Sequence, residues 1–174
     1  MEREGYEADK IRLYVMDLTT GEKNDFSEGF DQNAEGLKWG DDNTIWFISD
    51  WHATDEIYSL DIPTGRITKH TDGVHNYTSV IPTGKMLLAT KVSMSKPAEI
   101  YKVDPATGKD EELSFVNKPI LDQLTMGKVE KRWIKTTDNK DMLVWMIYPP
   151  HFDPNRKYPA ILYCEGGPQS TVSQ

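Results

Sequence analysis

Apolar and polar residues alternate with a period of two along most of the first 115 residues. Such alternation predicts β-strands that are buried on one face. One stretch occurs three times, at residues 13–21 (LYVMDLTTG), 57–65 (IYSLDIPTG) and 100–108 (IYKVDPATG). In each copy we expect a strand and then a tight turn, in which the Asp side chain caps the turn and the final Gly supplies a positive φ.

The three copies belong to a longer repeat, because the Asp of each copy follows the previous one by 44 and then 43 positions. A polar strand is expected after each copy, at 22–27, 66–71 and 110–115. Two earlier strands are expected before the second copy, at 36–39 and 44–49, and two before the third, at 77–81 and 85–90. Four strands in a repeat of this length are typical of a β-propeller blade.

The sequence therefore predicts half a blade at 11–27 and two complete blades at 36–71 and 77–115. A freestanding β-sandwich with accidentally similar strands is the alternative. Because a propeller needs at least four blades to close, we expect the chain to be a piece of a larger protein.

The pattern changes after residue 115. Residues 116–129 are irregular, and we expect at most one helical turn there, near 119–126. Two strands are predicted at 129–137 and 142–148, on either side of a turn. The apolar run 158–164 predicts a strand covered on both faces, with Cys164 packed at its end. This order suits the opening of an α/β sheet.

Composition and charge exclude several functions. The net charge is −8 and no cluster of Lys and Arg is present, which argues against a nucleic-acid-binding protein. No apolar run reaches the length of a membrane-spanning helix. The single cysteine, Cys164, excludes an internal disulfide framework and a cysteine-based zinc site.

The blade repeats, residues 148–154 (YPPHFDP) and residues 157–163 (KYPAILY) followed by Glu165-Gly166-Gly167-Pro168 resemble the prolyl oligopeptidase family of serine peptidases. Its dipeptidyl peptidase and acylaminoacyl peptidase branches are the most similar. The resemblance covers essentially the whole chain. It implies a mainly β fold: about two and a half four-stranded propeller blades, followed by the first strands of an α/β-hydrolase domain.

The domain organisation expected from this resemblance has three parts. Residues 1–115 would be the C-terminal part of the β-propeller, 116–129 a linker, and 130–174 the N-terminal strands of the peptidase domain. Exposed strand edges at the ends of such a piece predict that it self-associates.

The same resemblance implies a parent serine exopeptidase that releases short peptides from the N-termini of oligopeptides. The reaction would use a Ser-His-Asp triad and an acyl-enzyme. No Gly-x-Ser-x-Gly elbow is present and no triad residue is assigned, so we expect this chain alone to be inactive. The resemblance implies no metal or organic cofactor. It suggests a periplasmic or secreted parent, although the sequence does not fix the compartment.

Glu165, Gly166 and Gly167 are the candidates for an oxyanion loop. Backbone N–H groups aimed at the developing oxyanion lower the barrier to acyl transfer, and glycines allow the backbone to approach closely. Glu165 departs from the family pattern of His or Tyr, and an ionised carboxylate cannot donate a hydrogen bond. The resemblance therefore favours a backbone role, and a turn that only ends a strand is the alternative.

Other polar residues form weaker patterns. Asp50, Asp55 and Glu56 surround a loop, but without the spacing of a calcium loop they indicate a solvated turn. The run 110–112 (DEE) is similar to the paired glutamates that anchor a substrate N-terminus in dipeptidyl peptidases. Its place on a polar outer strand, directly after a hairpin, argues against that role. The four histidines show no ligand spacing.

Two other functions remain open at this point. A propeller scaffold whose hydrolase-like domain has lost its nucleophile would bind peptides or partners without cutting them. An ester hydrolase would use the same architecture on a different substrate. The downstream nucleophile elbow and a panel of dipeptidyl amides and short esters would separate these functions.

Overall fold

The computed structural model describes residues 3–6, 9–164 and 171–174. Within these residues the regular secondary structure is mainly β, with one short helix. The strands of the first part are β1 (Tyr14–Met16), β2 (Lys23–Asp25), β3 (Glu35–Asp41), β4 (Thr44–Asp50), β5 (Asp55–Asp61), β6 (Arg66–Lys69), β7 (Asn76–Thr83), β8 (Met86–Ser93), β9 (Lys96–Val103) and β10 (Asp110–Glu112). They are followed by α1 (Lys118–Leu121), β11 (Val129–Lys135) and β12 (Asp141–Ile147).

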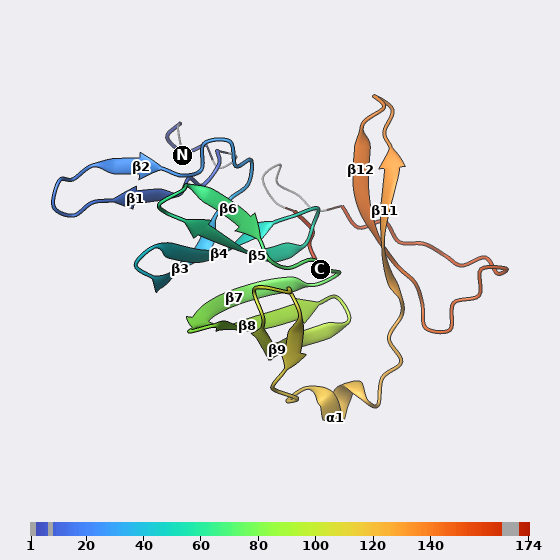
Figure 1. The fold of residues 1–174 in the computed structure, drawn as a ribbon. Helices are drawn as coiled ribbons and strands as arrows, with labels where there is room; N and C mark the ends of the chain where they lie inside the picture. The colour runs from blue at the N-terminus through green and yellow to red at the C-terminus, as the bar shows by residue number, and fades with distance from the viewer. Residues whose placement is uncertain (1–2, 7–8, 165–170) are drawn as a thin grey trace.

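The first ten strands group into three units that lie side by side (Figure 1). The first is the antiparallel pair β1–β2, and the other two are four-stranded antiparallel sheets in the orders β3-β4-β5-β6 and β7-β8-β9-β10. A single parallel pairing, between Asp55 and Asn76, joins the two complete sheets. The half blade and two complete blades expected from the repeat are confirmed.

Two apolar cores lie between the three units. The first, between the half blade and the first complete blade, contains Leu13, Ala34, Ile45, Phe47, Tyr58 and Leu60. The second, between the complete blades, contains Ile57, Tyr77, Val80, Leu87, Ala89, Tyr101 and Val103. Successive residues of β5 face opposite cores, as stacked blades require. Each fully buried aliphatic side chain contributes about 1.5–3 kcal/mol.

The repeated turns have the geometry that their sequence predicts. Asp17 Oδ1 accepts hydrogen bonds from the N–H groups of Thr19 and Thr20, at 2.7 and 3.1 Å. The glycines that close the three turns are Gly21, Gly65 and Gly108, with φ of 73°, 68° and 70°. Residues with a β-carbon are disfavoured at such φ values, so glycine follows from the turn itself.

A further repeated set of hydrogen bonds closes each unit at the end of its outer strand. A hydroxyl accepts a hydrogen bond from a backbone N–H of the preceding strand and donates one to a carboxylate. The hydroxyls and their N–H donors are Ser27 with Leu13 (3.0 Å), Thr71 with Ile57 (2.9 Å) and Ser114 with Ile100 (2.8 Å). The carboxylates are Asp25, Glu56 and Glu99. This set shows that the repeat extends beyond the Asp and Gly of the turn.

After the last blade the chain runs through α1 to the hairpin β11–β12, which stands beside the blades (Figure 1). The expected helical turn and both strands of the hairpin are confirmed.

The strand expected at 158–164 is wrong for this structure. These residues are irregular and lie largely in solvent, with Ile161 97% and Leu162 87% exposed. A strand needs a neighbour to satisfy its backbone groups, and no strand of the described residues pairs with this segment. Cys164 is correspondingly exposed, not buried.

Candidate functional site

One end of the blades faces the hairpin. The loop between β4 and β5 reaches β11, where the rings of His52 and Trp133 meet edge to face with centroids 5.3 Å apart. His52 and Ala53, at the tip of this loop, have positive φ values of 50° and 60°. Side chains are disfavoured at such φ values, so tertiary contacts must hold the loop in this form.

The C-terminal segment 171–174 lies at the same end. Asn76 Nδ2 donates to Ser173 Oγ at 2.8 Å, and Trp145 Nε1 in β12 donates to the carbonyl of Val172 at 3.0 Å. Asn76 is buried, and its Oδ1 accepts a hydrogen bond from the N–H of Asp55 at 3.1 Å. This asparagine therefore links both complete blades to the segment that comes after the Gly-Gly-Pro sequence.

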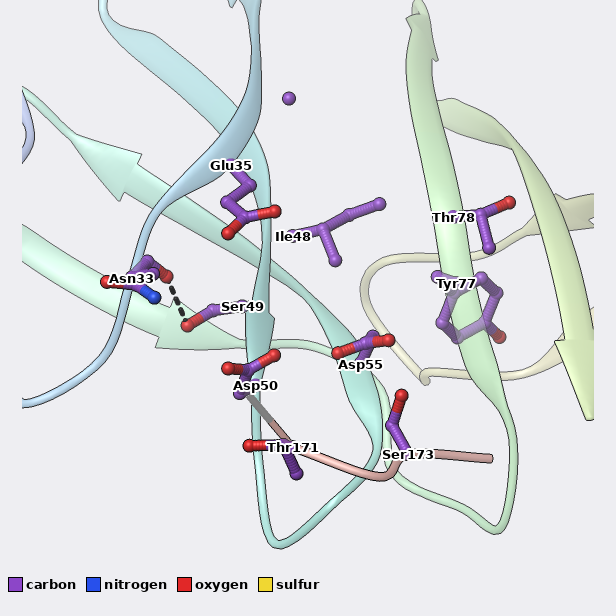
Figure 2. A pocket seen from close by; sticks show the side chains of 11 residues that line it. Asn33, Glu35, Ile48, Ser49, Asp50, Asp55, Tyr77, Thr78, Thr171 and Ser173 are labelled. Atoms are coloured by element: carbon purple, nitrogen blue, oxygen red, sulfur yellow. Dashed lines mark hydrogen bonds between the residues drawn. The ribbon is translucent and has the colours of Figure 1, made fainter. Parts of the chain in front are cut away.

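A cavity of about 300 Å³ opens at this end, between the two complete blades and the C-terminal segment (Figure 2). Its polar lining includes Asn33, Glu35, Ser49, Asp50, Asp55, Tyr77, Thr78, Thr171 and Ser173. Ser49 is fixed by a hydrogen bond that its hydroxyl donates to the carbonyl of Asn33, at 2.6 Å. The cavity is therefore lined by three carboxylates, those of Glu35, Asp50 and Asp55, together with several hydroxyl groups.

Asp50 and Asp55 are opposite each other in the β4–β5 register, and both side chains reach the cavity (Figure 2). Burial raises the pKa of Asp55 to about 7, and a hydrogen bond with Asp50 and the negative charges of Asp50 and Glu35 act in the same direction. Such a pair favours a cationic group, because a cation relieves the repulsion between the carboxylates. Its chemistry suits an ammonium or guanidinium group.

The structure separates Glu56 from the other two acidic residues. Glu56 is fully buried and its carboxylate accepts hydrogen bonds from Thr54 Oγ1 at 3.1 Å and Thr71 Oγ1 at 2.6 Å. The solvated turn expected at 50–56 is therefore wrong for Glu56. Its position next to Asp55 in a strand directs the two side chains to opposite faces of the sheet.

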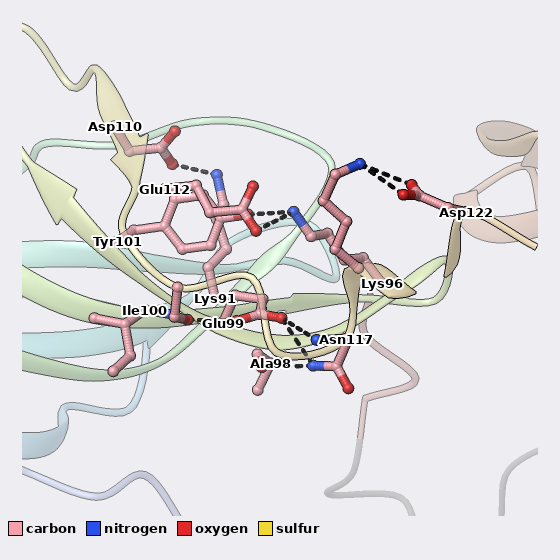
Figure 3. A network of polar contacts seen from close by, with 12 residues as sticks. Lys91, Lys96, Ala98, Glu99, Ile100, Tyr101, Asp110, Glu112, Asn117 and Asp122 are labelled. Carbon is pink, nitrogen blue, oxygen red and sulfur yellow. Dashed lines mark hydrogen bonds and ion pairs between the residues drawn. The ribbon is translucent and has the colours of Figure 1, made fainter. Parts of the chain in front are cut away.

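The acidic run 110–112 forms β10, on the outer edge of the last blade. Asp110 and Glu112 pair with Lys91 and Lys96 (Figure 3). The lysine of the second pair lies 2.6 Å from its carboxylate. Ion pairs on an outer strand agree with the expectation that this run is not the anchor of a substrate N-terminus.

The oxyanion-loop candidates Glu165, Gly166 and Gly167 lie outside the described residues. Among the residues that the structure describes, no group of three or more His, Cys, Asp and Glu side chains is arranged to hold a metal ion. Across the same residues, no helix is long and apolar enough to span a membrane.

Sequence reasoning missed the cavity itself. Its walls combine residues from three separate parts of the chain. Asn33 and Glu35 lie just before and at the start of β3, Asp50 and Asp55 lie at the two ends of the β4–β5 loop, and Tyr77 lies in the next blade. One signal was available. The predicted strands at 44–49 and from residue 57 form a hairpin, and both Asp50 and Asp55 lie in the short loop between them.

The chain is similar to peptidases over its whole length. Dipeptidyl-peptidase 5 of Porphyromonas gingivalis is 43% identical over 175 residues, a match that covers 100% of this chain and 26% of that protein. Dipeptidyl-peptidase 5 of Arthroderma otae is 25% identical, and the match covers 98% of this chain and 24% of that protein. The chain thus spans about a quarter of the length of the curated relatives that it matches. No family model matches the chain.

The fold is similar to that of a solved peptidase. The acylaminoacyl peptidase of Pyrococcus horikoshii superposes with a TM-score of 0.71 at 19% identity, covering 90% of this chain and 23% of that one. At this level of identity the likeness shows the fold alone. Together with the dipeptidyl-peptidase 5 relatives, the propeller blades and the hairpin beyond them show that the chain belongs to the prolyl oligopeptidase family.

Proposed function

We propose that the chain is part of a serine exopeptidase that releases short peptides from the N-termini of oligopeptides. The observation that carries this proposal is the 43% identity, over all of this chain, to a dipeptidyl-peptidase 5. In this proposal the blades restrict access to the active site, and the catalytic Ser, Asp and His come from a part of the protein beyond residue 174. The backbone of Glu165, Gly166 and Gly167 contributes donors for the oxyanion.

The acidic cavity suggests how such an enzyme would recognise a free N-terminus. The N-terminal ammonium of a peptide would bind between Asp50 and Asp55, where charge-assisted hydrogen bonds are strong. The cavity also contains Thr171, four residues beyond Gly167. An enzyme that holds its substrate by the N-terminal amine cuts at a fixed distance from that end, so the product would be a short peptide.

The test uses the full-length protein and dipeptidyl amides with either a free or an acetylated N-terminus. We expect cleavage of the free form only, and its loss after treatment with a serine-reactive organophosphonate. In the double variant D50N/D55N we expect KM to rise roughly tenfold with little change in kcat, because anchoring by the amine is uniform binding. Asp42→Asn, in the exposed turn between β3 and β4, is the matched control and should leave KM unchanged.

Equal cleavage of the acetylated substrate would contradict recognition of the N-terminus. An unchanged KM in the double variant would show that the amine binds elsewhere. Activity on short esters without activity on peptides would favour the ester hydrolase, and inactivity on both classes would favour the non-catalytic scaffold.

A further inference from the structure

Glu99 ties the end of the last blade to the start of the linker. This residue of β9 is only 3% exposed, and one of its carboxylate oxygens accepts hydrogen bonds from the backbone N–H of Asn117 at 2.8 Å and from Asn117 Nδ2 at 3.0 Å (Figure 3). The other oxygen accepts the hydroxyl of Ser114. Asn117 Nδ2 also reaches the carbonyl of Ala98, at 3.3 Å. The contact therefore joins the residue just before α1 to the sheet.

The preceding blade has a glutamate at the equivalent position, but the hydrogen-bond partners of its carboxylate differ. Glu56 occupies the position of Glu99, 43 residues earlier, and its two oxygens accept the hydroxyls of Thr71 and Thr54. Thr71 corresponds to Ser114, so one oxygen has the same partner in both blades. Thr54 corresponds to Pro97, which has no hydroxyl. The second oxygen of Glu99 thus lacks its blade partner and is available to Asn117.

Asn117 uses its side chain for this contact and not for the helix. It stands at the N-cap of α1, where asparagine usually accepts a hydrogen bond from the first turn, but its side chain makes no cap. Leu121 and Asp122 close the helix on the carbonyls of Asn117 and Lys118, at 3.0 and 2.9 Å. The direction in which the chain leaves the blade is therefore set where the carboxylate holds Asn117.

We propose that Glu99 and Asn117 are positioning residues that fix the linker, and with it the β11–β12 hairpin and the segment leading to Gly166 and Gly167, against the last blade. The last blade has Pro97 where the preceding blade has Thr54, and the missing hydroxyl leaves one oxygen of Glu99 available for Asn117. The effect of the Glu99–Asn117 contact on catalysis rests on the proposed function, whereas the contact itself is independent of it.

Hydrogen exchange in the full-length protein tests the contact. Asn117→Asp keeps the size of the side chain and improves the helix cap, but it removes the Nδ2 donors and places a second carboxylate against Glu99, while the backbone N–H of residue 117 is kept. We expect amides 114–122 to exchange roughly tenfold faster, with the blade cores unchanged. Thr54→Ala, which removes the equivalent partner of Glu56, is the matched control and should leave amides 114–122 unchanged. Slower exchange at 118–122 in N117D would mean that Asn117 serves only as a cap and would overturn the proposal.

Kinetics on the same variants test the positioning role. We expect N117D to lower kcat on dipeptidyl amides roughly fivefold or more, because small displacements of catalytic groups are costly, with melting temperature and KM little changed. Asn117→Ser keeps a donor and should restore most of kcat. Faster exchange at 114–122 with an unchanged kcat would overturn the positioning role. An inactive wild-type protein would contradict the proposed function, while the exchange measurement would still decide the contact.

Discussion

The glycine at position 108 meets two demands at once. Its φ of 70° is one that side chains disfavour, and a β-carbon placed there would lie 2.5 Å from the carbonyl oxygen of His70 in the preceding blade. Gly21, at the equivalent turn of the half blade, has a φ of 73° but open space around it. The same turn therefore has open space around its glycine in one copy of the repeat and packs against the preceding blade in another.

This difference predicts unequal costs for the same substitution. Gly21→Ala should lower the free energy of unfolding by about 1–2 kcal/mol, the cost of a β-carbon at positive φ. Gly108→Ala should cost roughly 3 kcal/mol or more, because the backbone of residue 70 must also move. Urea unfolding of the two variants measures both values. Equal losses would show that the contact with His70 has no energetic weight.

Asp55 gives the stability a pH dependence. Its pKa is raised from 3.8 to about 7, so between these values the folded state binds more protons than the unfolded state. The free energy of unfolding should therefore decrease as the pH rises from about 4 to about 7 at this site. Asp55→Asn should remove that part of the pH dependence and stabilise the protein at pH 8. Urea unfolding at pH 5 and pH 8 measures the effect, and a variant that is less stable at pH 8 would contradict it.

Glu99 gives the free energy of unfolding the opposite pH dependence. The hydroxyl of Ser114 and then the backbone N–H of Asn117 hold its pKa down to about 2. A carboxyl with a depressed pKa stabilises the fold above its unfolded value and loses that effect as the pH falls towards the folded value. Its contact with Asn117 should therefore be intact throughout the range from pH 5 to pH 8.

At the scale of elements, the two faces of a blade can be compared within this one chain. Ile57 is fully buried because the next blade covers it, whereas its repeat equivalent Ile100, on the open face of the last blade, is 46% exposed. Ile57→Ala should lower the free energy of unfolding by about 3 kcal/mol, and Ile100→Ala by less than about 1 kcal/mol. Thermal or urea unfolding of both variants is the measurement. Similar losses would mean that the open face is covered in solution, for instance by a second copy of the chain.

The sequence allowed the blade strands and the hairpin to be predicted because their signals are local. Alternation, the Asp of the turn and the closing Gly all lie within nine residues. The segment 158–164 carries an equally strong apolar signal, yet it forms no strand here. Whether an apolar run pairs depends on strands from elsewhere in a sheet, and a propensity does not contain that information.

The site was harder to predict for the same reason. The role of Glu56 depends on Thr71, fifteen residues later, and the acidic cavity requires two blades to be stacked in register. Only the pairing of Asp50 with Asp55 could have been found locally. The roles of Glu165, Gly166 and Gly167 stay predictions, because these residues lie outside the described part of the chain.

At the scale of the whole molecule, three of the contacts among the described residues illustrate how the blades connect to the chain that follows them. They are the Glu99–Asn117 contact at the linker, the ring pair of His52 and Trp133, and the hydrogen bond from Asn76 to Ser173. All three lie at one end of the blades, where the acidic cavity opens. The blades expose apolar side chains at their open face, so self-association of this chain stays a prediction.

In the proposed function, this chain joins the propeller to the catalytic domain of a serine exopeptidase. The most direct measurement is to label the full-length protein with a fluorophosphonate and map the modified residue by mass spectrometry. We expect one labelled serine, C-terminal to Gln174 and within a Gly-x-Ser-x-Gly sequence, whose labelling abolishes the release of dipeptides. An absence of labelling, or a labelled serine within residues 1–174, would contradict it.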